Sequence, residues 1–457
     1  MPELLAHAAA EPARLLIRGA RVLDPREDVD RTLDVAVADG VITTIGEPGT
    51  VEAPDGAAEL DAAGRLLVPG FVDPHVHFRT PGQEHKETIA TGTAAAAAGG
   101  YCAVLAMPNT DPVLDSAPLL RSLFEEASRS ARVPLGFVPA ITRGLDGTEL
   151  TEMAELRAAG AAGFTDDGKP VVSAGMLRKA LQYQRMCGGT LALHEEDPSL
   201  SAGGSMHEGT VSAVLGVAGI PSISESTMVA RDAQIAGYEH GAIHIQHVSA
   251  RASVEAIADA KARGVRITGE ASPHHLCLTD EAVRDLDTRR KMNPPLRTED
   301  DRQALIAGLR DGTLDCIATD HAPHARSGKE VPFEQAPMGS TGLETAFAAI
   351  YTELVLPGVL DLGLLVRRMS DGARLFELDT PRVAQGAPAN LTLIDLDATW
   401  VAGEHGYASR SANCCFDGMT LRSQIQMTIA AGAIVHRGNH IGGPRPGSPS
   451  EQERVGA

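Results

Sequence analysis

The chain has 457 residues, of which 43% are hydrophobic and 22% charged, and this composition is ordinary for a globular protein. Its formal net charge of −20 at pH 7 argues against non-specific binding to nucleic acid or to an anionic membrane. No apolar run of about 18 residues is present, so no membrane-spanning helix is expected. The six cysteines form no C-x-x-C pair, and their sparse use, with an N-terminus that lacks a basic start, predicts a cytoplasmic location.

Both ends of the chain contain short strand-like runs. These runs are residues 14–18, 33–37, 41–45, 389–395 and 428–435. Asp39-Gly40 is a hairpin signal between two of them. We predict that residues 1–66 and 386–441 pair into one small β-rich, sandwich-like domain. Residues 442–457 are rich in Gly, Pro, Ser and charge, which predicts a disordered tail.

The middle of the chain, residues 67–385, alternates short apolar runs with helix-like segments such as 87–98 and 252–263. The candidate strands are residues 66–72, 102–106, 135–141, 161–164, 190–193, 242–245, 265–269 and 314–318. Eight such β/α repeats predict an α/β fold with a (β/α)8 TIM-like barrel.

Polar side chains follow the ends of most of these predicted strands. They are His75, His77, Asn109, Asp166, Asp167, His194, His247 and Asp320. In a (β/α)8 barrel these positions converge on one mouth, where active sites lie. His75 and His77 occupy alternate positions of an extended segment, so their rings point the same way. Taken singly, each histidine could be structural, but the combination favours a metal centre.

The size of this set favours two metal ions. A catalytic zinc uses three protein ligands and keeps one position open, so four histidines and two aspartates are too many for one ion. Two ions bridged by a carboxylate would use the whole set, and Asp167 is placed to bridge. Water held between two such ions ionises near neutral pH, which predicts hydrolytic chemistry with Asp320 as the proton acceptor.

The motifs around these residues resemble those of the amidohydrolase superfamily, and closely those of the bacterial type I dihydroorotases. The matching stretches are residues 70–79, 107–110, 164–168, 207–209, 272–275, 291–297 and 317–324. The resemblance implies ring opening and closure between L-dihydroorotate and N-carbamoyl-L-aspartate in pyrimidine synthesis. It also implies two divalent metal ions per chain, with zinc as the expected ion.

The resemblance assigns roles to individual residues. The implied metal ligands are His75, His77, Asp167, His194, His247 and Asp320. Many relatives bridge their metals with a carboxylated lysine, so Lys169 is the alternative bridge to Asp167. The implied substrate-binding residues are Arg79, Asn109, Asn293 and His324. In the long segment after the last predicted strand, backbone groups near Met338 and Gly339 are expected to touch the ring. A guanidinium grips a carboxylate bidentately, which supports Arg79 independently, although a surface salt bridge is the alternative.

The expected mechanism has Asp320 accept the proton of water and deliver it to the leaving nitrogen. Cyclisation then starts from protonated Asp320 and should favour lower pH. The long segment 321–341 is expected to become ordered when substrate binds.

Two other functions stay open at this point. One is a hydantoinase, dihydropyrimidinase or allantoinase, and the other is an inactive scaffold for aspartate transcarbamoylase. A homodimer is an expectation from the resemblance, and association with aspartate transcarbamoylase is compatible with an active enzyme.

Overall fold

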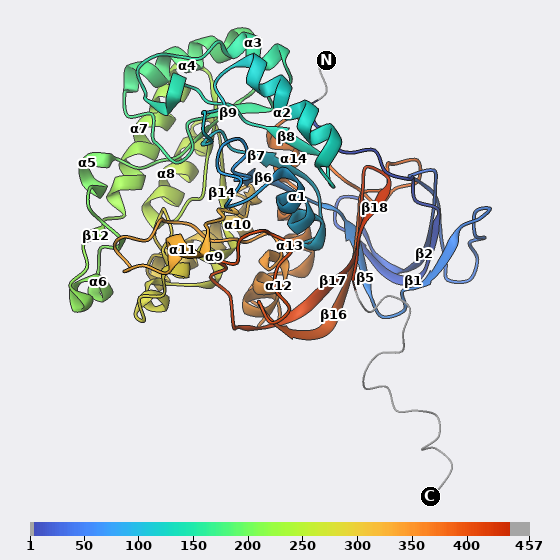
Figure 1. The fold of residues 1–457 in the computed structure, drawn as a ribbon. Coiled ribbons are helices and arrows are strands. Elements are labelled where there is room, and N and C mark those ends of the chain that lie inside the picture. Colours follow the sequence, from blue (N-terminus) through green and yellow to red (C-terminus); the bar gives the residue numbers. More distant parts are fainter. Residues whose placement is uncertain (1–3, 439–457) are drawn as a thin grey trace, which may run out of the picture.

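The computed structural model describes residues 4–438, which form a closed barrel and a curved sheet built from both ends of the chain (Figure 1). The predicted tail at 442–457 lies outside the described residues.

Parallel strands form the barrel. They are β6 (Phe71–Val76), β7 (Tyr101–Ala106), β8 (Leu135–Phe137), β9 (Gly163–Thr165), β10 (Thr190–Leu193), β13 (Ala242–Ile245), β14 (Arg266–Ala271) and β15 (Cys316–Ile317). Their pairings give two arcs, β6-β7-β8 and β9-β10-β13-β14-β15. The amide of Ala162 donates to Phe137 O at 3.0 Å, and the amide of His77 donates to His321 O at 2.9 Å. These bonds join the arcs at both ends, so the barrel is closed.

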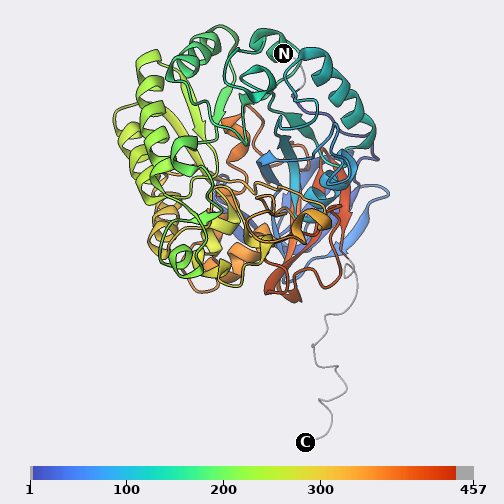
Figure 2. The same ribbon diagram turned by 60° about the vertical axis from the view of Figure 1, so that its left-hand side comes forward.

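Helices surround the barrel, as the turned view in Figure 2 shows. The longer ones are α1 (Ile89–Ala98), α2 (Ala117–Ser130), α4 (Ala174–Cys187), α7 (Ile223–Glu239), α8 (Arg251–Ala262) and α10 (Glu299–Asp311). Thr88 Oγ1 accepts the amide of Thr91 at the start of α1, and Thr298 Oγ1 accepts that of Asp301 at the start of α10. These capping contacts explain where both helices begin. Among residues 4–438, no helix has the length and apolar character needed to cross a membrane.

The shorter elements lie in the connections. The helices are α3 (Met153–Ala158), α5 (Pro198–Ser201), α6 (Thr210–Leu215), α9 (Pro273–Cys277), α11 (Arg326–Lys329), α12 (Ala346–Ile350), α13 (Leu362–Arg368) and α14 (Gly372–Leu375). The 3₁₀ turns are η1 (Arg143–Leu145), η2 (Asp280–Val283) and η3 (Thr288–Arg290), and η4 (Tyr351–Val355) is a π-helix. Two short strands, β11 (Met206–His207) and β12 (Gly219–Ile220), pair with each other.

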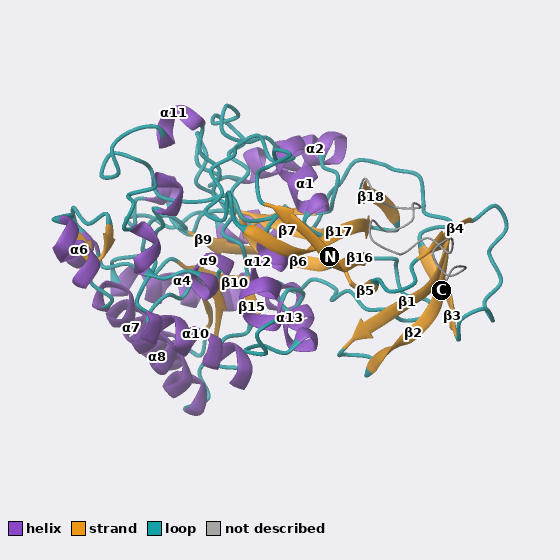
Figure 3. Ribbon diagram, turned by 90° about the horizontal axis from the view of Figure 1, so that it is seen from below, coloured by secondary structure: helices purple, strands orange, loops and turns teal. Residues whose placement is uncertain are grey.

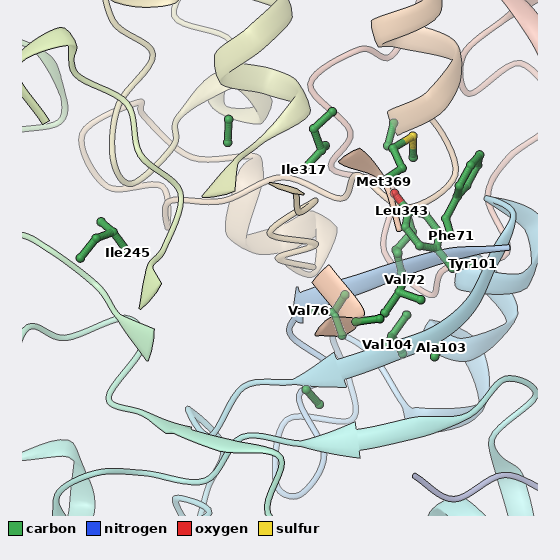
Figure 4. Close-up of a cluster of buried hydrophobic side chains, with 14 of the residues drawn as sticks. Phe71, Val72, Val76, Tyr101, Ala103, Val104, Ile245, Ile317, Leu343 and Met369 are labelled. Carbon is green, nitrogen blue, oxygen red and sulfur yellow. The ribbon is translucent and has the colours of Figure 1, made fainter. Parts of the chain in front are cut away.

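The barrel strands are buried on both faces, as is usual for parallel sheets, and their side chains form the core of the barrel. Every residue of β6 and β7 is buried. Figure 4 shows Phe71 and Val76 of β6 beside Tyr101 and Val104 of β7. Phe71 stacks on Phe347 of α12 with ring centroids 5.4 Å apart. This apolar packing holds the strand that carries His75.

The second unit is a sheet drawn from both chain ends. Its strands are β1 (Leu15–Asp24), β2 (Val29–Ala38), β3 (Val41–Gly46), β4 (Ala58–Asp61), β5 (Leu66–Pro69), β16 (Leu391–Val401), β17 (Thr420–Ala430) and β18 (Ala433–Arg437). In Figure 3 the strands β1, β2, β3 and β4 stand clear of the barrel helices. Buried residues from β1, β2, β16 and β17 share one hydrophobic core. The expected β-rich unit from both ends is therefore present.

The two hairpin turns that lead into the edge strands β3 and β18 meet each other, so the sheet curls around its core. The β17–β18 turn carries Gly432, whose carbonyl accepts the amide of Ala13 at 2.7 Å. The β2–β3 turn carries Gly40, whose carbonyl accepts the amide of Ala389 at 2.8 Å. A Cβ on Gly432 would lie 2.7 Å from the Cα of Gly40, so only glycine permits this approach.

Two predicted strands are each divided in the structure. The predicted strand 66–72 is two strands, because β5 pairs with β1 and β16 of the curled sheet while β6 begins the barrel. The boundary predicted between residues 66 and 67 therefore falls within β5. The predicted run 428–435 is interrupted by the turn at Ala431-Gly432. Apolar content continues through both breaks, so hydrophobicity alone did not reveal them.

Candidate active site

The predicted site residues gather at the carboxyl ends of the barrel strands. Every predicted metal-ligand and substrate-binding residue except the fully buried His75 lines a single cavity of about 220 Å³. The lining residues are His77, Arg79, Asn109, Asp167, Gly168, His194, His247, Asn293, Asp320, Ala322, His324, Met338 and Gly339. Side chains from different strands, far apart in the sequence, therefore share one pocket.

The carboxylate of Asp167 lies among four imidazole rings. Its Oδ1 is 3.4 Å from His75 Nε2, 3.6 Å from His194 Nδ1 and 3.5 Å from His247 Nε2. Its Oδ2 is 3.3 Å from His77 Nε2. Each carboxylate oxygen thus faces different histidines, which is the arrangement expected of a bridging ligand.

Asp320 lies on another side of the same cluster. Its Oδ1 is 3.0 Å from His77 Nε2 and 3.5 Å from His75 Nε2. The potential ligand atoms form two groups that share His75. One contains Asp167 and His247, and the other contains His77 and Asp320.

The spacing around Asp167 fits metal coordination. Hydrogen bonds from nitrogen to oxygen span about 2.7–3.2 Å, whereas ligand atoms placed tetrahedrally about 2.1 Å from a zinc ion lie roughly 3.4 Å apart. The separations around Asp167, from 3.3 to 3.6 Å, match the second value. His75 Nε2 is buried and has no hydrogen-bond partner within residues 4–438, although it faces both carboxylates. The donor set and this orphaned nitrogen therefore fit divalent metal ions.

Neighbouring charges keep the two aspartates ionised. Burial acts to raise the pKa of Asp167, but the charge of His75 and the close approach of His194 and His247 hold it well below its ordinary value. The same opposition between burial and the charge of His75 places the pKa of Asp320 at about 2. Both carboxylates are therefore anionic at neutral pH, which is the form that binds metal ions.

Side chains around the cluster orient two of the imidazole rings. His77 Nδ1 donates to Asn109 Oδ1 at 2.8 Å, and His194 Nε2 donates to Glu196 Oε2 at 3.2 Å. A ring that donates one N–H keeps a lone pair on its other nitrogen, which is then available to a metal. In both residues that other nitrogen faces Asp167.

Arg79 brings a buried cation to the same cavity. Its side-chain Nε donates to Pro323 O at 3.2 Å, and no carboxylate among residues 4–438 forms an ion pair with it. Burial lowers the pKa of Arg79 to about 10, so the guanidinium is still charged at neutral pH. A buried cation with no carboxylate in direct contact is costly, and a ligand carboxylate would supply that contact.

Comparison with known proteins identifies the family. The family described as "Dihydro-orotase-like" matches residues 64–253. A dihydroorotase of Pelotomaculum thermopropionicum is 46% identical, and the match covers 92% of this chain and 98% of the relative. A dihydroorotase of Syntrophus aciditrophicus is 44% identical, with 93% of this chain and 99% of the relative covered. The chain belongs to the dihydroorotase family.

Solved structures support the fold of this dihydroorotase family member. An L-hydantoinase (dihydropyrimidinase) from Arthrobacter aurescens has a TM-score of 0.82 at 24% identity and covers 93% of this chain and 96% of its own. A D-hydantoinase (dihydropyrimidinase) from Thermus sp. has a TM-score of 0.77 at 24% identity, with coverages of 93% and 95%. At these identities the likeness bears on the fold alone, and it confirms the predicted fold class.

The segment between β16 and β17, from the C-terminal part of the chain, closes one side of the barrel mouth. Between β16 and β17, Asn413 Nδ2 donates to the carbonyls of Ala322 and Gly339 at 3.1 Å each, and its Oδ1 accepts the amide of His324 at 3.0 Å. His324 Nε2 donates to Met338 O at 2.7 Å. Sequence analysis missed Asn413, because it lies in the segment assigned to the β-rich domain.

Two glutamates near the cluster were also missed. Glu196 accepts from His194 and from Asn293 Nδ2, the latter at 2.7 Å. Glu270 accepts from His75 Nδ1 at 2.6 Å. An acidic residue at the end of an apolar strand was the available signal for Glu270, and a position two residues after a predicted ligand was the signal for Glu196.

Two charged residues close to Asp167 in the sequence, Asp166 and Lys169, do not belong to the cluster. The carboxylate of Asp166 turns the other way and accepts the amides of Ile141 and Thr142 at 2.8 and 2.9 Å. Lys169, the alternative bridge, is exposed and does not line the cavity. Its position argues against that alternative.

Proposed function

We propose that this chain catalyses the reversible hydrolysis of L-dihydroorotate to N-carbamoyl-L-aspartate, in the de novo synthesis of pyrimidine nucleotides. The observation that carries the proposal is buried Arg79, which lacks a carboxylate partner and lines the same cavity as the histidine–aspartate cluster. Dihydroorotate bears a carboxylate beside its cyclic amide, so it can meet both features at once. The relatives named dihydroorotase support the same substrate.

We further propose that the cluster holds two divalent ions, with zinc as the expected metal and Asp167 as the bridge. The proposed ligands are His75, His77, Asp167, His194, His247 and Asp320. Support comes from the two groups of potential ligand atoms and from Asp167, whose oxygens face different histidines. Ions held there supply Lewis acidity at the substrate carbonyl and lower the pKa of bound water.

Asp320 is the proposed proton carrier. In hydrolysis, water adds to the amide carbonyl carbon and the bond from that carbon to the ring nitrogen breaks. Asp320 accepts a proton from the water and returns it to the leaving nitrogen. The reverse reaction needs protonated Asp320, so cyclisation is expected to gain rate as the pH falls.

The remaining cavity residues have proposed roles in holding the substrate. Arg79 pairs with its carboxylate, and Asn109, Asn293 and His324 supply polar contacts. The backbone at Met338 and Gly339 is the proposed contact for the ring. All of these residues line the cavity.

Substrate preference tests the proposal. Purified protein is assayed with dihydroorotate, hydantoin and allantoin, and its metal content is measured on the same sample. Turnover of dihydroorotate well above the other two, with about two metals per chain, is the expected result. Preference for hydantoin or allantoin would show that dihydroorotate is not the substrate. No turnover of any of the three after zinc is supplied would favour the alternative of an inactive scaffold for aspartate transcarbamoylase.

The Arg79→Met variant tests the role of the cation directly. Charge-assisted hydrogen bonds contribute about 1.5–3 kcal/mol, so the loss in kcat/KM for dihydroorotate is expected to be roughly 10–100-fold. Any activity on hydantoin, which has no carboxylate, is expected to change little. Equal losses on both substrates would contradict a carboxylate-binding role.

The expected partners stay predictions. A homodimer and an association with aspartate transcarbamoylase rest on the family resemblance, and the cytoplasmic location rests on the sparse cysteines and the N-terminal sequence. Light scattering after size-exclusion chromatography, with and without aspartate transcarbamoylase, measures both assemblies.

A further inference from the structure

We propose that Glu270 is a positioning residue that prepares two of the proposed metal ligands, His75 and His247, for metal binding. The proposal rests on the metal role assigned above to these histidines. Glu270 lies at the end of β14, with its side chain 1% exposed. It does not line the cavity, so any effect on substrate or metal must pass through the residues it contacts.

One carboxylate oxygen of Glu270 contacts both ligands. Its Oε1 accepts His75 Nδ1 at 2.6 Å and the backbone amide of His247 at 3.1 Å. The first contact places the ring proton of His75 on Nδ1. In the neutral form of the ring, which is the form that binds a metal, the lone pair is thereby left on Nε2, the nitrogen that faces Asp167 and Asp320.

The second contact acts on the backbone. His247 has a φ of +34°, in the left-handed region that non-glycine residues rarely adopt. The hydrogen bond from its amide to Glu270 satisfies a buried donor at this strained position. In this conformation His247 Nε2 lies 3.5 Å from Asp167 Oδ1. Glu270 therefore stabilises the backbone geometry that aims His247 at the cluster.

The other carboxylate oxygen of Glu270 accepts a hydrogen bond from a second buried histidine, His244. Its Oε2 accepts His244 Nε2 at 3.0 Å, and His244 Nδ1 lies 2.9 Å from Thr268 Oγ1. His244, Glu270 and Cys316 could in principle hold a metal of their own. Because His244 and Glu270 already satisfy each other by hydrogen bonding, this contact instead fixes the carboxylate and leaves Oε1 directed at His75.

The Glu270→Gln variant tests the proposal with a readout other than activity. Glutamine keeps the shape but presents an amide NH₂ in place of one oxygen, so it cannot accept from both His75 and His244. Metal affinity is measured by competition with a chelator, and the spectrum of the cobalt-substituted protein reports on the ligand geometry. Loss of such a partner typically weakens metal affinity about 10–100-fold, and this loss is expected here with an altered cobalt spectrum.

The matched control is Glu225→Gln. Glu225 is also a buried carboxylate that accepts backbone amides, those of Ser249 and Ala250 at 3.0 and 3.1 Å. It contacts none of the proposed ligands, so its variant is expected to lose stability but to keep wild-type metal affinity. Equal metal affinity in Glu270→Gln and the wild type would overturn the proposal, and so would an equal loss in both variants.

A second variant guards against failure of Glu270→Gln to fold. Glu270→Asp keeps the charge but shortens the side chain, so it cannot reach both His75 and His247 and is expected to bind metal more weakly. Unchanged affinity in that variant would also overturn the proposal. If the wild-type protein itself binds no metal, the proposed function fails, which is a distinct outcome.

Discussion

Three residues of the candidate site have left-handed backbone. Arg79, His247 and Asp320 have φ angles of +59°, +34° and +48°, and none is glycine. Such conformations cost about 1–3 kcal/mol each and persist where the surrounding structure over-determines them. All three lie just beyond barrel strands. The buried strand fixes the backbone before each residue, and each residue also makes a hydrogen bond, Arg79 with Pro323, His247 with Glu270 and Asp320 with His77. The side chains that face the cavity are therefore fixed by the fold before any ligand arrives.

Asp320→Asn should separate metal binding from proton transfer. An amide oxygen can still bind a metal, but it cannot accept the proton of water, so kcat is expected to fall by about 10²–10⁴-fold with the metal retained. Steady-state rates and metal analysis on the same preparation measure this. Asp311→Asn, at an exposed position, is the control and should leave both unchanged. Near-normal turnover of Asp320→Asn would exclude the proton-carrier role.

At the scale of the elements, the connections between strands decide the site. The mouth is built from the loops after β6, β7, β9, β10, β13, β14 and β15, and from the β16–β17 segment that carries Asn413. Each strand fixes where its following loop begins, because its hydrogen bonds and buried side chains hold its axis. The loop then carries the functional side chain. The curled sheet likewise depends on its turns, where Gly40 and Gly432 approach each other.

Replacing Gly432 by alanine should destabilise the curled sheet. Gly432 has a φ of +77° and its Cβ would lie 2.7 Å from the Cα of Gly40. Gly358 has a φ of +76° but open space around its Cβ, so Gly358→Ala carries the backbone cost alone. Gly432→Ala is expected to lose about 1–3 kcal/mol more unfolding free energy than Gly358→Ala, as measured by urea denaturation. Equal losses would show that the turns do not pack as described.

The segment 321–341 is expected to become better protected when substrate binds. It contains α11 and contributes Ala322, His324, Met338 and Gly339 to the cavity lining. A ligand that contacts these residues should suppress local opening of the segment. Hydrogen exchange with and without dihydroorotate measures this, and α2, on the outside of the barrel, should not respond. Unchanged protection of residues 321–341 would contradict the prediction.

At the scale of the whole molecule, bound metal should stabilise the native fold. The ligands come from β6 and from the loops after four other strands, so they are brought together only in the folded chain. A ligand that binds only the folded state at 100 times its Kd adds about 2.7 kcal/mol. Chelation is therefore expected to lower Tm, and added zinc to restore it. A Tm unaffected by chelator would contradict this.

Single-site variants make the stability measurement specific. His77→Ala removes a proposed ligand, and its Tm should respond less to chelator than that of the wild type. His405→Ala changes an exposed histidine outside the candidate site, and its response should remain. Equal responses in both variants would place the metal elsewhere.

The sequence by itself determined the barrel and the β-rich unit from both chain ends, and it predicted the histidines and aspartates that the structure gathers at one mouth. These followed from signals that are local along the chain: apolar runs of strand length, polar residues at their ends, and short motifs such as His75-Val-His77. Such signals can be recognised without the tertiary structure, because hydrophobic periodicity and side-chain chemistry are properties of the sequence itself.

Tertiary structure alone decided how those residues are supported. The division between β5 and β6 is set by strand pairing, because the apolar run continues from Leu66 through Val72 across both strands. The contacts of Glu270 with His75 and of Asn413 with Gly339 join residues that are distant in the sequence. No local pattern encodes them, since hydrogen-bond partners are fixed only when the barrel closes and brings its strand ends to one mouth.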